Sequence, residues 1–129
     1  MRRIFLAAAL ALALPLATPL LVATPFVGPA FATDYLSGIT DLPLPEGLKE
    51  AKDKSTVFDS AVGRIVNAYA SGPGTMDSVH DFYSSTLPQL GWTETDEGNW
   101  RRENQTLKID VLGPEAGPVT ATFTLSSDN

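Results

Sequence analysis

Residues 75–92, TMDSVHDFYSSTLPQLGW, contain the clearest helix signal of the chain. Thr75 is suited to cap the helix N-terminus, and Asp77 suits the positive end of the helix dipole. Pro88 would clash with the carbonyl of the preceding turn, so the helix should stop or kink just before it, and Gly91 is then placed to reverse the chain. Apolar side chains recur every three to four positions, as on the buried face of a helix: Met76, Val79, Phe82 or Tyr83, Leu87 and Leu90.

The chain after this helix predicts an antiparallel meander. Residues 92–95 and 100–103 flank a polar turn, and residues 107–111 alternate apolar and polar side chains. Residues 119–126 show the cleanest alternation of the chain, which is typical of a strand with one face on the core. We expect the Thr and Ser side chains of this last strand to face water or to be only lightly covered.

The chain before the helix predicts a β-hairpin and an extended lead-in. Residues 55–59 and 64–70 carry β-forming side chains around the turn 60–63, and the segment 71–74 is expected to end the second strand. The lead-in, residues 33–54, is rich in Pro, which favours extended conformation over helix. We expect three of its side chains to cover one side of the core: Leu42, Leu44 and Leu48.

These elements predict an α+β fold in the order β-β-α-β-β-β. A single main helix is expected to pack on an antiparallel sheet of 4–5 strands, as the simplest two-layer arrangement. The predicted organisation is a signal peptide at residues 1–32, the extended Pro-rich lead-in at 33–54, and the α+β domain at 55–129.

Residues 1–32 have the pattern of a signal peptide. Arg2 and Arg3 precede an uncharged run of Ala and Leu, and the sequence Ala-Phe-Ala that ends at Ala32 matches a signal peptidase site. The alternative is an uncleaved membrane anchor, but four Pro residues interrupt the segment and disfavour a continuous spanning helix. We expect a Sec-type signal cleaved after Ala32, a periplasmic or secreted protein, and no stable membrane insertion after cleavage.

Charge and cysteine content exclude several classes of function. After Ala32 the chain carries 15 acidic residues against seven basic ones, a formal net charge of −8. Such a surface disfavours nucleic acid as a partner, because phosphate binding needs clustered Lys and Arg. The chain has no Cys, which excludes disulfides and a lipoprotein anchor. We therefore expect a protein or an envelope component as the partner, and the oligomeric state stays open.

The sequence contains no complete catalytic motif, so we expect no enzymatic activity, no catalytic residue and no cofactor. His80 is the only His, and it is spaced to lie beside Asp77 and Asp81 on one helix. One His with two helix carboxylates is too small a ligand set for a metal, and a solvated helix flank is the simpler interpretation. An envelope hydrolase that uses His80 remains an alternative.

The aromatic side chains and their basic neighbours are the best candidates for binding. Trp100, Arg101, Tyr83 and Trp92 are the predicted binding residues, because exposed Trp on a sheet is a common platform for partners. For Trp92 we favour a place in the core, whereas for Trp100 both positions stay open. Arg101 and the adjacent Arg102 can form a cation–π contact, an anion-binding spot or ion pairs across the strands.

Three segments resemble a group of small exported proteins of unknown function from alphaproteobacteria: FYSSTLPQLGW at 82–92, PLPEGL at 43–48 and VFDS at 57–60. In that group, a helix ending in "FY…L…GW" leads into a strand meander. The resemblance covers most of residues 41–125. It implies the same helix-to-strand corner and an exported location, and it carries no activity or site residues.

The sequence as a whole favours a non-enzymatic accessory or binding module that holds a protein or envelope component through a sheet edge or an aromatic patch. The lead-in is expected either to guard that edge or to dock on the partner. A different alternative is a carrier of a small apolar ligand, with a pocket between helix and sheet lined by Phe82, Tyr83, Val66 and Phe123. The same four side chains would also suit an ordinary core.

Overall fold

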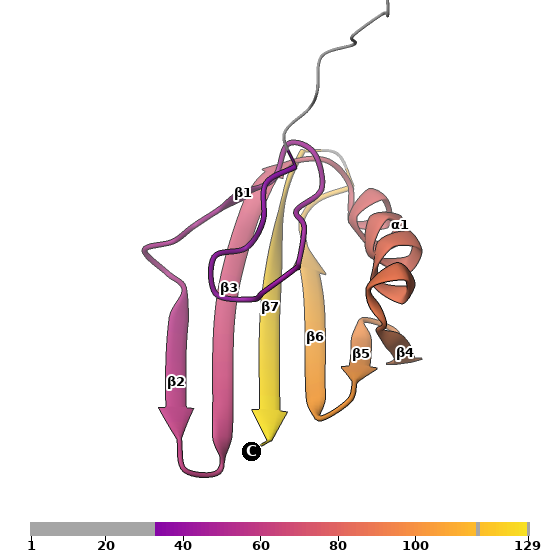
Figure 1. Ribbon diagram of the computed structural model, residues 1–129. Coiled ribbons are helices and arrows are strands. Elements are labelled where there is room, and N and C mark those ends of the chain that lie inside the picture. The colour runs from indigo at the N-terminus through magenta and orange to yellow at the C-terminus, as the bar shows by residue number, and fades with distance from the viewer. Residues whose placement is uncertain (1–32, 116, 129) are drawn as a thin grey trace, which may run out of the picture. The chain divides into compact units, whose positions relative to one another are not determined.

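The computed structural model describes residues 33–115 and 117–128. They form a seven-stranded antiparallel sheet and one layer, which contains the helix, packed on it (Figure 1). Across the sheet, β1 and β2 both pair with β3 along the same edge, followed by β7, β6, β5 and β4. The helix α1 spans Met76–Thr86, and the short 3-10 helix η1 spans Leu87–Leu90. The strands are β1 (Lys49–Glu50), β2 (Thr56–Ser60), β3 (Gly63–Pro73), β4 (Thr93–Asp96), β5 (Asn99–Arg102), β6 (Gln105–Leu112) and β7 (Pro118–Asp128).

This arrangement confirms the α+β class, the single main helix and the antiparallel sheet. The predicted strand number and the order β-β-α-β-β-β are wrong, since three strands precede the helix and four follow it. β1 has only two residues, too few to show an alternating pattern. β3 also runs through the segment that was expected to end it. Its last residue, Pro73, faces Pro118 at the end of the ladder, where a missing N–H costs little.

The helix begins and ends at the residues that the sequence indicated. The Thr75 Oγ1 accepts a hydrogen bond from the Ser78 N–H at 3.0 Å, and the Ser78 Oγ accepts one from the Thr75 N–H at 3.0 Å. This reciprocal pair is a capping box. At the other end, Gly91 adopts φ 85°, a left-handed conformation that glycine reaches without strain, and turns the chain into β4.

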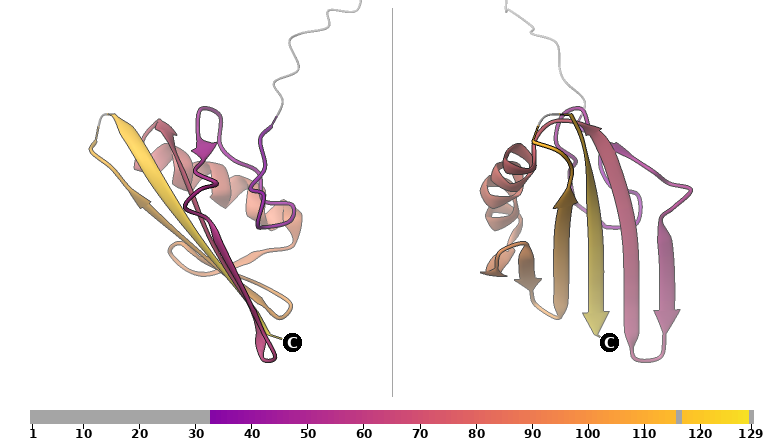
Figure 2. Two further views of the ribbon diagram at one scale, coloured as in Figure 1. Left: turned by 90° about the vertical axis from the view of Figure 1, so that its left-hand side faces the viewer. Right: turned by 180° about the vertical axis from the view of Figure 1, so that it is seen from behind.

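The helix and the lead-in cover the same face of the sheet, which makes this a two-layer structure. Figure 2 shows both elements on one side of the strands and, from behind, an opposite face that no helix or loop crosses. The Thr and Ser side chains of β7 lie on this open face and are exposed or half-buried, as predicted: Thr120, Thr122, Thr124 and Ser126.

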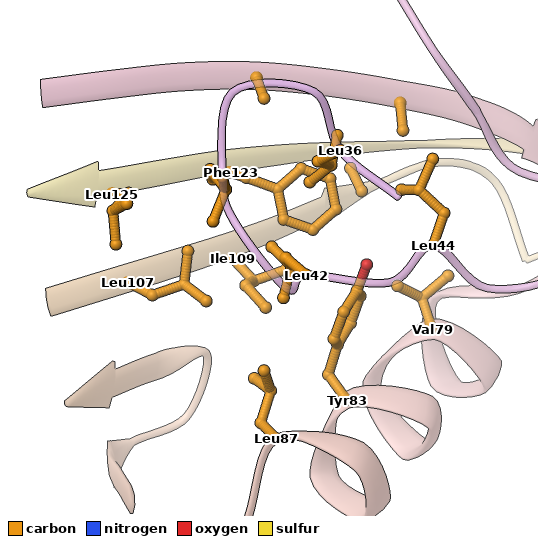
Figure 3. Close-up of a cluster of buried hydrophobic side chains, with 14 of the residues drawn as sticks. Leu36, Leu42, Leu44, Val79, Tyr83, Leu87, Leu107, Ile109, Phe123 and Leu125 are labelled. Atoms are coloured by element: carbon orange, nitrogen blue, oxygen red, sulfur yellow. The ribbon is translucent and has the colours of Figure 1, made fainter. Parts of the chain in front are cut away.

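The core forms where lead-in, helix and sheet meet (Figure 3). The lead-in contributes Leu36, Ile39, Leu42, Leu44 and Leu48, all buried, so the expected covering role of its leucines is confirmed. α1 contributes Val79 and Tyr83, and η1 contributes Leu87; all three pack toward Leu107, Ile109, Phe123 and Leu125 of the sheet.

Tyr83 ties the three parts of the core together. Its hydroxyl donates a hydrogen bond of 2.9 Å to the carbonyl of Pro43 in the lead-in. Its ring packs edge-on against the Phe123 ring of β7, with centroids 5.6 Å apart. Residues 33–54 therefore belong to the same compact unit as the strands and helix that follow them.

The predicted signal peptide, residues 1–32, and its cleavage after Ala32 lie outside the described residues. Within residues 33–115 and 117–128, neither helix has the length and apolar character needed to cross a membrane.

Candidate functional site

The four predicted binding residues do not form a common surface. Trp92 and Trp100 are 4% and 3% exposed, and Tyr83 is buried as well. Trp100 follows the strand alternation that also buries Leu107, its partner across β5 and β6. Arg101 is exposed and points to the opposite face of β5, away from Trp100. The expected aromatic patch is therefore absent from the described surface, and the sheet edges remain as the candidate.

The two adjacent arginines differ in their surroundings. Arg102 forms the cation–π contact that the sequence allowed, but with Trp92, whose ring centroid lies 4.4 Å from the guanidinium carbon. Its Nε and Nη2 donate to the Gln105 Oε1, and its Nη1 donates to the carbonyl of Leu90. These contacts hold Arg102 between the end of η1 and the sheet, whereas Arg101 lies on the other face.

His80 lies on an exposed flank of α1. Its Nδ1 lies 3.8 Å from the Asp81 Oδ1, with both side chains largely in solvent. His80 also lines a surface hollow of about 390 Å³ together with Asp77, Glu97 and Asp110. No group of three or more His, Cys, Asp or Glu among the described residues is arranged to hold a metal ion. The solvated helix flank is the interpretation that this geometry favours.

The proposed apolar-ligand pocket is filled by the protein itself. Val66, Tyr83 and Phe123 are buried in the core. Leucines of the lead-in pack beside Tyr83 and Phe123 (Figure 3). Phe82 is partly buried and lines a different, surface hollow of about 290 Å³ beside the lead-in. The four side chains therefore belong to the core or pack against it, and we do not retain the carrier hypothesis.

The β2–β3 hairpin exposes an unusual amount of apolar surface. Phe58 is 65% exposed and faces its cross-strand partner Ile65, 42% exposed, on the open face of the sheet. Val57 is exposed on the opposite face, and Val62, at the hairpin turn, is 82% exposed. We call these four side chains the hairpin surface. They place apolar groups on both faces and at the tip of one hairpin, where monomeric proteins usually carry polar residues.

The local sequence explains how the hairpin closes. The Ser60 Oγ donates to the carbonyl of Gly63 at 3.1 Å and accepts from the N–H of Val62 at 3.3 Å. Gly63 adopts φ 153°, and a Cβ at this position would lie 2.2 Å from the carbonyl oxygen of Ser127. Only glycine therefore fits where the hairpin meets the end of β7. Across the first pair beyond the turn, the Arg64 Nε lies 3.7 Å from the Asp59 Oδ1.

The two edges of the sheet differ in their protection against strand addition. β4 has four residues, an irregular register between Glu94 and Asp96, and two carboxylates, all features that discourage pairing with another chain. β2 is regular in register and pairs only with β3 among the strands of the described part. Along Thr56–Asp59, the segment we call the β2 edge, Val57 and Phe58 are apolar and Asp59 is the only charge.

The sequence indicated the hairpin but not its exposed side chains. The signal that points to them is the adjacency of Val57 and Phe58, since neighbouring strand residues face opposite sides and a sheet with one bare face can bury only one of them. No protein-family model, curated protein or solved structure matches this chain.

Proposed function

We propose that this chain is an exported, non-enzymatic binding module that holds a protein partner by adding an extended segment of that partner to the β2 edge. The contrast between the two sheet edges carries the proposal, because β4 has two carboxylates and an irregular register that discourage pairing, whereas the β2 edge is regular and carries one charge, Asp59. In strand addition, backbone hydrogen bonds supply affinity, and alternate side chains supply specificity.

The chemistry around the β2 edge defines the partner. Val57 and Phe58 offer apolar contacts on the two faces of an added strand. The chain has 15 acidic and nine basic residues, so a segment that carries Lys or Arg beside its apolar positions is electrostatically favoured over an acidic one. The expected occupant is therefore an extended, apolar segment with basic flanks from another protein.

A site-specific crosslinking experiment tests this proposal. A photoreactive residue is placed at Phe58 or, as a control, at Glu94 of β4, and the crosslinked partner segment is mapped by mass spectrometry from the native envelope fraction. The crosslinked protein is recovered through an affinity tag in the loop after β6. A C-terminal tag would lie beside the hairpin, because Asp128 pairs with Gly63. We expect crosslinks from position 58, and none from position 94, to one segment of a single partner.

A matched pair of double variants provides the control. Val57→Lys/Phe58→Lys and Thr93→Lys/Thr95→Lys add the same charge to opposite edges, and all four side chains are exposed, so both variants should fold. We expect the first to reduce capture of the partner at least about tenfold and the second to leave it unchanged. Equal capture by both variants contradicts the proposal, and a crosslink between the β2 edges of two copies reassigns the edge to self-association.

A further inference from the structure

A row of polar side chains crosses the sheet on the face that the lead-in covers, and at its β2 end Asp59 is paired with Arg64. Arg64 of β3 is paired with Ser127 of β7, Ser127 with Gln105 of β6, and Gln105 with Arg102 of β5. Directly opposed residues of antiparallel strands point to the same face, so these four side chains lie in one line. The neighbouring row is fully apolar, which makes the polar row the border of the core: Val66, Leu125, Leu107 and Trp100.

The lead-in turns this row into a pocket. Loop residues 38–40 lie over the sheet close enough that a Cβ on Gly38 would be 2.9 Å from the Val66 Cγ1. The resulting cavity, about 210 Å³, is lined by this loop, by Leu125 and by the four side chains of the row. Thr40 and Ser127 add hydroxyl groups to the lining, and none of the described residues that line the pocket carries a carboxylate.

The two arginines differ in the number of contacts that hold them. Arg102 rests on the Trp92 ring and donates three of its five N–H groups to Gln105 and Leu90, and no described residue accepts from the remaining two. Arg64 is half-exposed, and its Nε lies 3.7 Å from the Asp59 Oδ1, a long distance for an ion pair. A guanidinium held by several contacts and one held by a single long ion pair therefore line the same small cavity.

We infer that this pocket binds a small oxyanion of the phosphate class between Arg64 and Arg102. Guanidinium groups match the paired oxygens of such anions, and the hydroxyls of Thr40 and Ser127 supply further donors. A cavity of about 210 Å³ suits a phosphate group rather than a large organic ligand. In a chain with six more acidic than basic residues, a pocket with two arginines and no lining carboxylate is a local exception. The inference does not depend on strand addition at the β2 edge.

Titration with inorganic phosphate at constant ionic strength, followed by amide chemical shifts, tests the site in protein expressed from the full chain. We expect saturable shifts at residues 38–40, Gln105 and Ser127. Arg64→Gln should weaken binding at least about tenfold, since it removes a charged partner of the anion. Arg101→Gln, which removes the same charge on the opposite face, should leave binding unchanged.

A second variant keeps the test independent of the arginines. Ser127→Asp retains both guanidinium groups but places a carboxylate at the centre of the row, and it should abolish the phosphate shifts. The inference is overturned if wild-type protein shows no saturable shift, or if Arg101→Gln weakens binding as much as Arg64→Gln.

Vesicles distinguish the two sources of such an anion. If the site takes a lipid headgroup, the protein should cosediment with phosphatidylglycerol vesicles but not with phosphatidylcholine vesicles, and Arg64→Gln and Ser127→Asp should both abolish this. Saturable binding of inorganic phosphate without cosedimentation assigns the site to a soluble anion. Cosedimentation that survives both variants in a protein without phosphate shifts would overturn the site.

Discussion

Tyr83 shows how much a single polar atom contributes to this small core. Its ring fills the space between the helix and Phe123, while its hydroxyl supplies a partner for the buried carbonyl of Pro43. Without that hydroxyl, the carbonyl would lose its partner in an apolar environment, at a cost of about 1–3 kcal/mol. Burial also raises the pKa of the Tyr83 phenol above its ordinary value, because an ionised phenol would lose its hydration in the core.

The Tyr83→Phe variant should therefore be less stable than wild type at neutral pH, and its stability should depend on pH differently above pH 10. In the wild type, the unfolded state ionises Tyr83 above pH 10 while the folded state keeps it neutral, so the stability contribution falls as pH rises through that range. We expect wild type to exceed Tyr83→Phe by about 1 kcal/mol at pH 7, and the difference to shrink by about 1.4 kcal/mol per pH unit above pH 10. Urea unfolding at several pH values measures both effects.

Tyr35→Phe is the matched control, since Tyr35 is exposed and lies outside the core. This variant should follow the wild-type stability curve. A constant difference between wild type and Tyr83→Phe up to pH 11 would contradict the assigned burial of the phenol.

At the same scale, the candidate site was only partly predictable from the sequence. Trp100 has the amphipathic ring of a binding residue, yet its place opposite Leu107 in the sheet buries it. Phe58 looks like an ordinary core residue, yet its alternation with Val57 puts it on the open face. Residue type sets what a side chain can do, but the register between strands, which depends on distant segments, decides which face it occupies.

At the scale of elements, local signals predicted those parts of the fold that depend on local contacts. The helix bounds follow from Thr75, Pro88 and Gly91, all of which act within a few residues of their own position. β1 could not be predicted, because its two residues form a strand only through pairing with Ser71 and Ala70. β4 and β5 follow the two segments that the sequence indicated, 92–95 and 100–103, because the polar turn between them is also a local signal.

The capping box of α1 leads to a prediction at this scale. Thr75→Ala removes the acceptor of the Ser78 N–H and should lower the free energy of unfolding by about 1 kcal/mol. Thr75→Asp keeps a side-chain acceptor and adds a favourable charge at the helix N-terminus, so it should retain or exceed wild-type stability. Thermal unfolding by circular dichroism compares the three proteins. Equal stability of Thr75→Ala and wild type would show that the cap contributes nothing.

At the scale of the whole folded unit, the lead-in is the second half of the covering layer. The helix alone covers the side of the sheet near β6, and the buried leucines of the lead-in cover β3 and β7 (Figure 1, Figure 3). The sequence predicted that these leucines face the core, but Pro-rich segments without regular pattern do not reveal their path. That path depends on contacts between residues far apart in the chain, such as the hydrogen bond from Tyr83 to Pro43.

Leu42→Ala tests whether the lead-in folds together with the rest. Leu42 is fully buried, so the truncation should leave a cavity and lower the free energy of unfolding by about 3 kcal/mol, in a single cooperative transition. Leu112→Ala, at an exposed position, should change stability by less than about 0.5 kcal/mol. Guanidinium unfolding followed by Trp fluorescence measures both. A Leu42→Ala protein as stable as wild type would mean that the lead-in folds separately.

The long β3–β7 ladder has a mechanical consequence. Its opposed pairs run from Gly63 with Asp128 to Pro73 with Pro118, and β6 flanks β7 on the other side. Thr33 lies near the Pro73 end of this ladder, since it lines one hollow with Gly47 and Gly47 lies against Pro73, whereas Asp128 pairs with Gly63 at the opposite end. A tensile load between these two points runs along β7, at right angles to its hydrogen bonds. The hydrogen bonds of β7 to β3 and β6 must then break together, instead of one after another. When the domain is pulled between these two points, we expect it to resist until a high force and then to unfold in a single step.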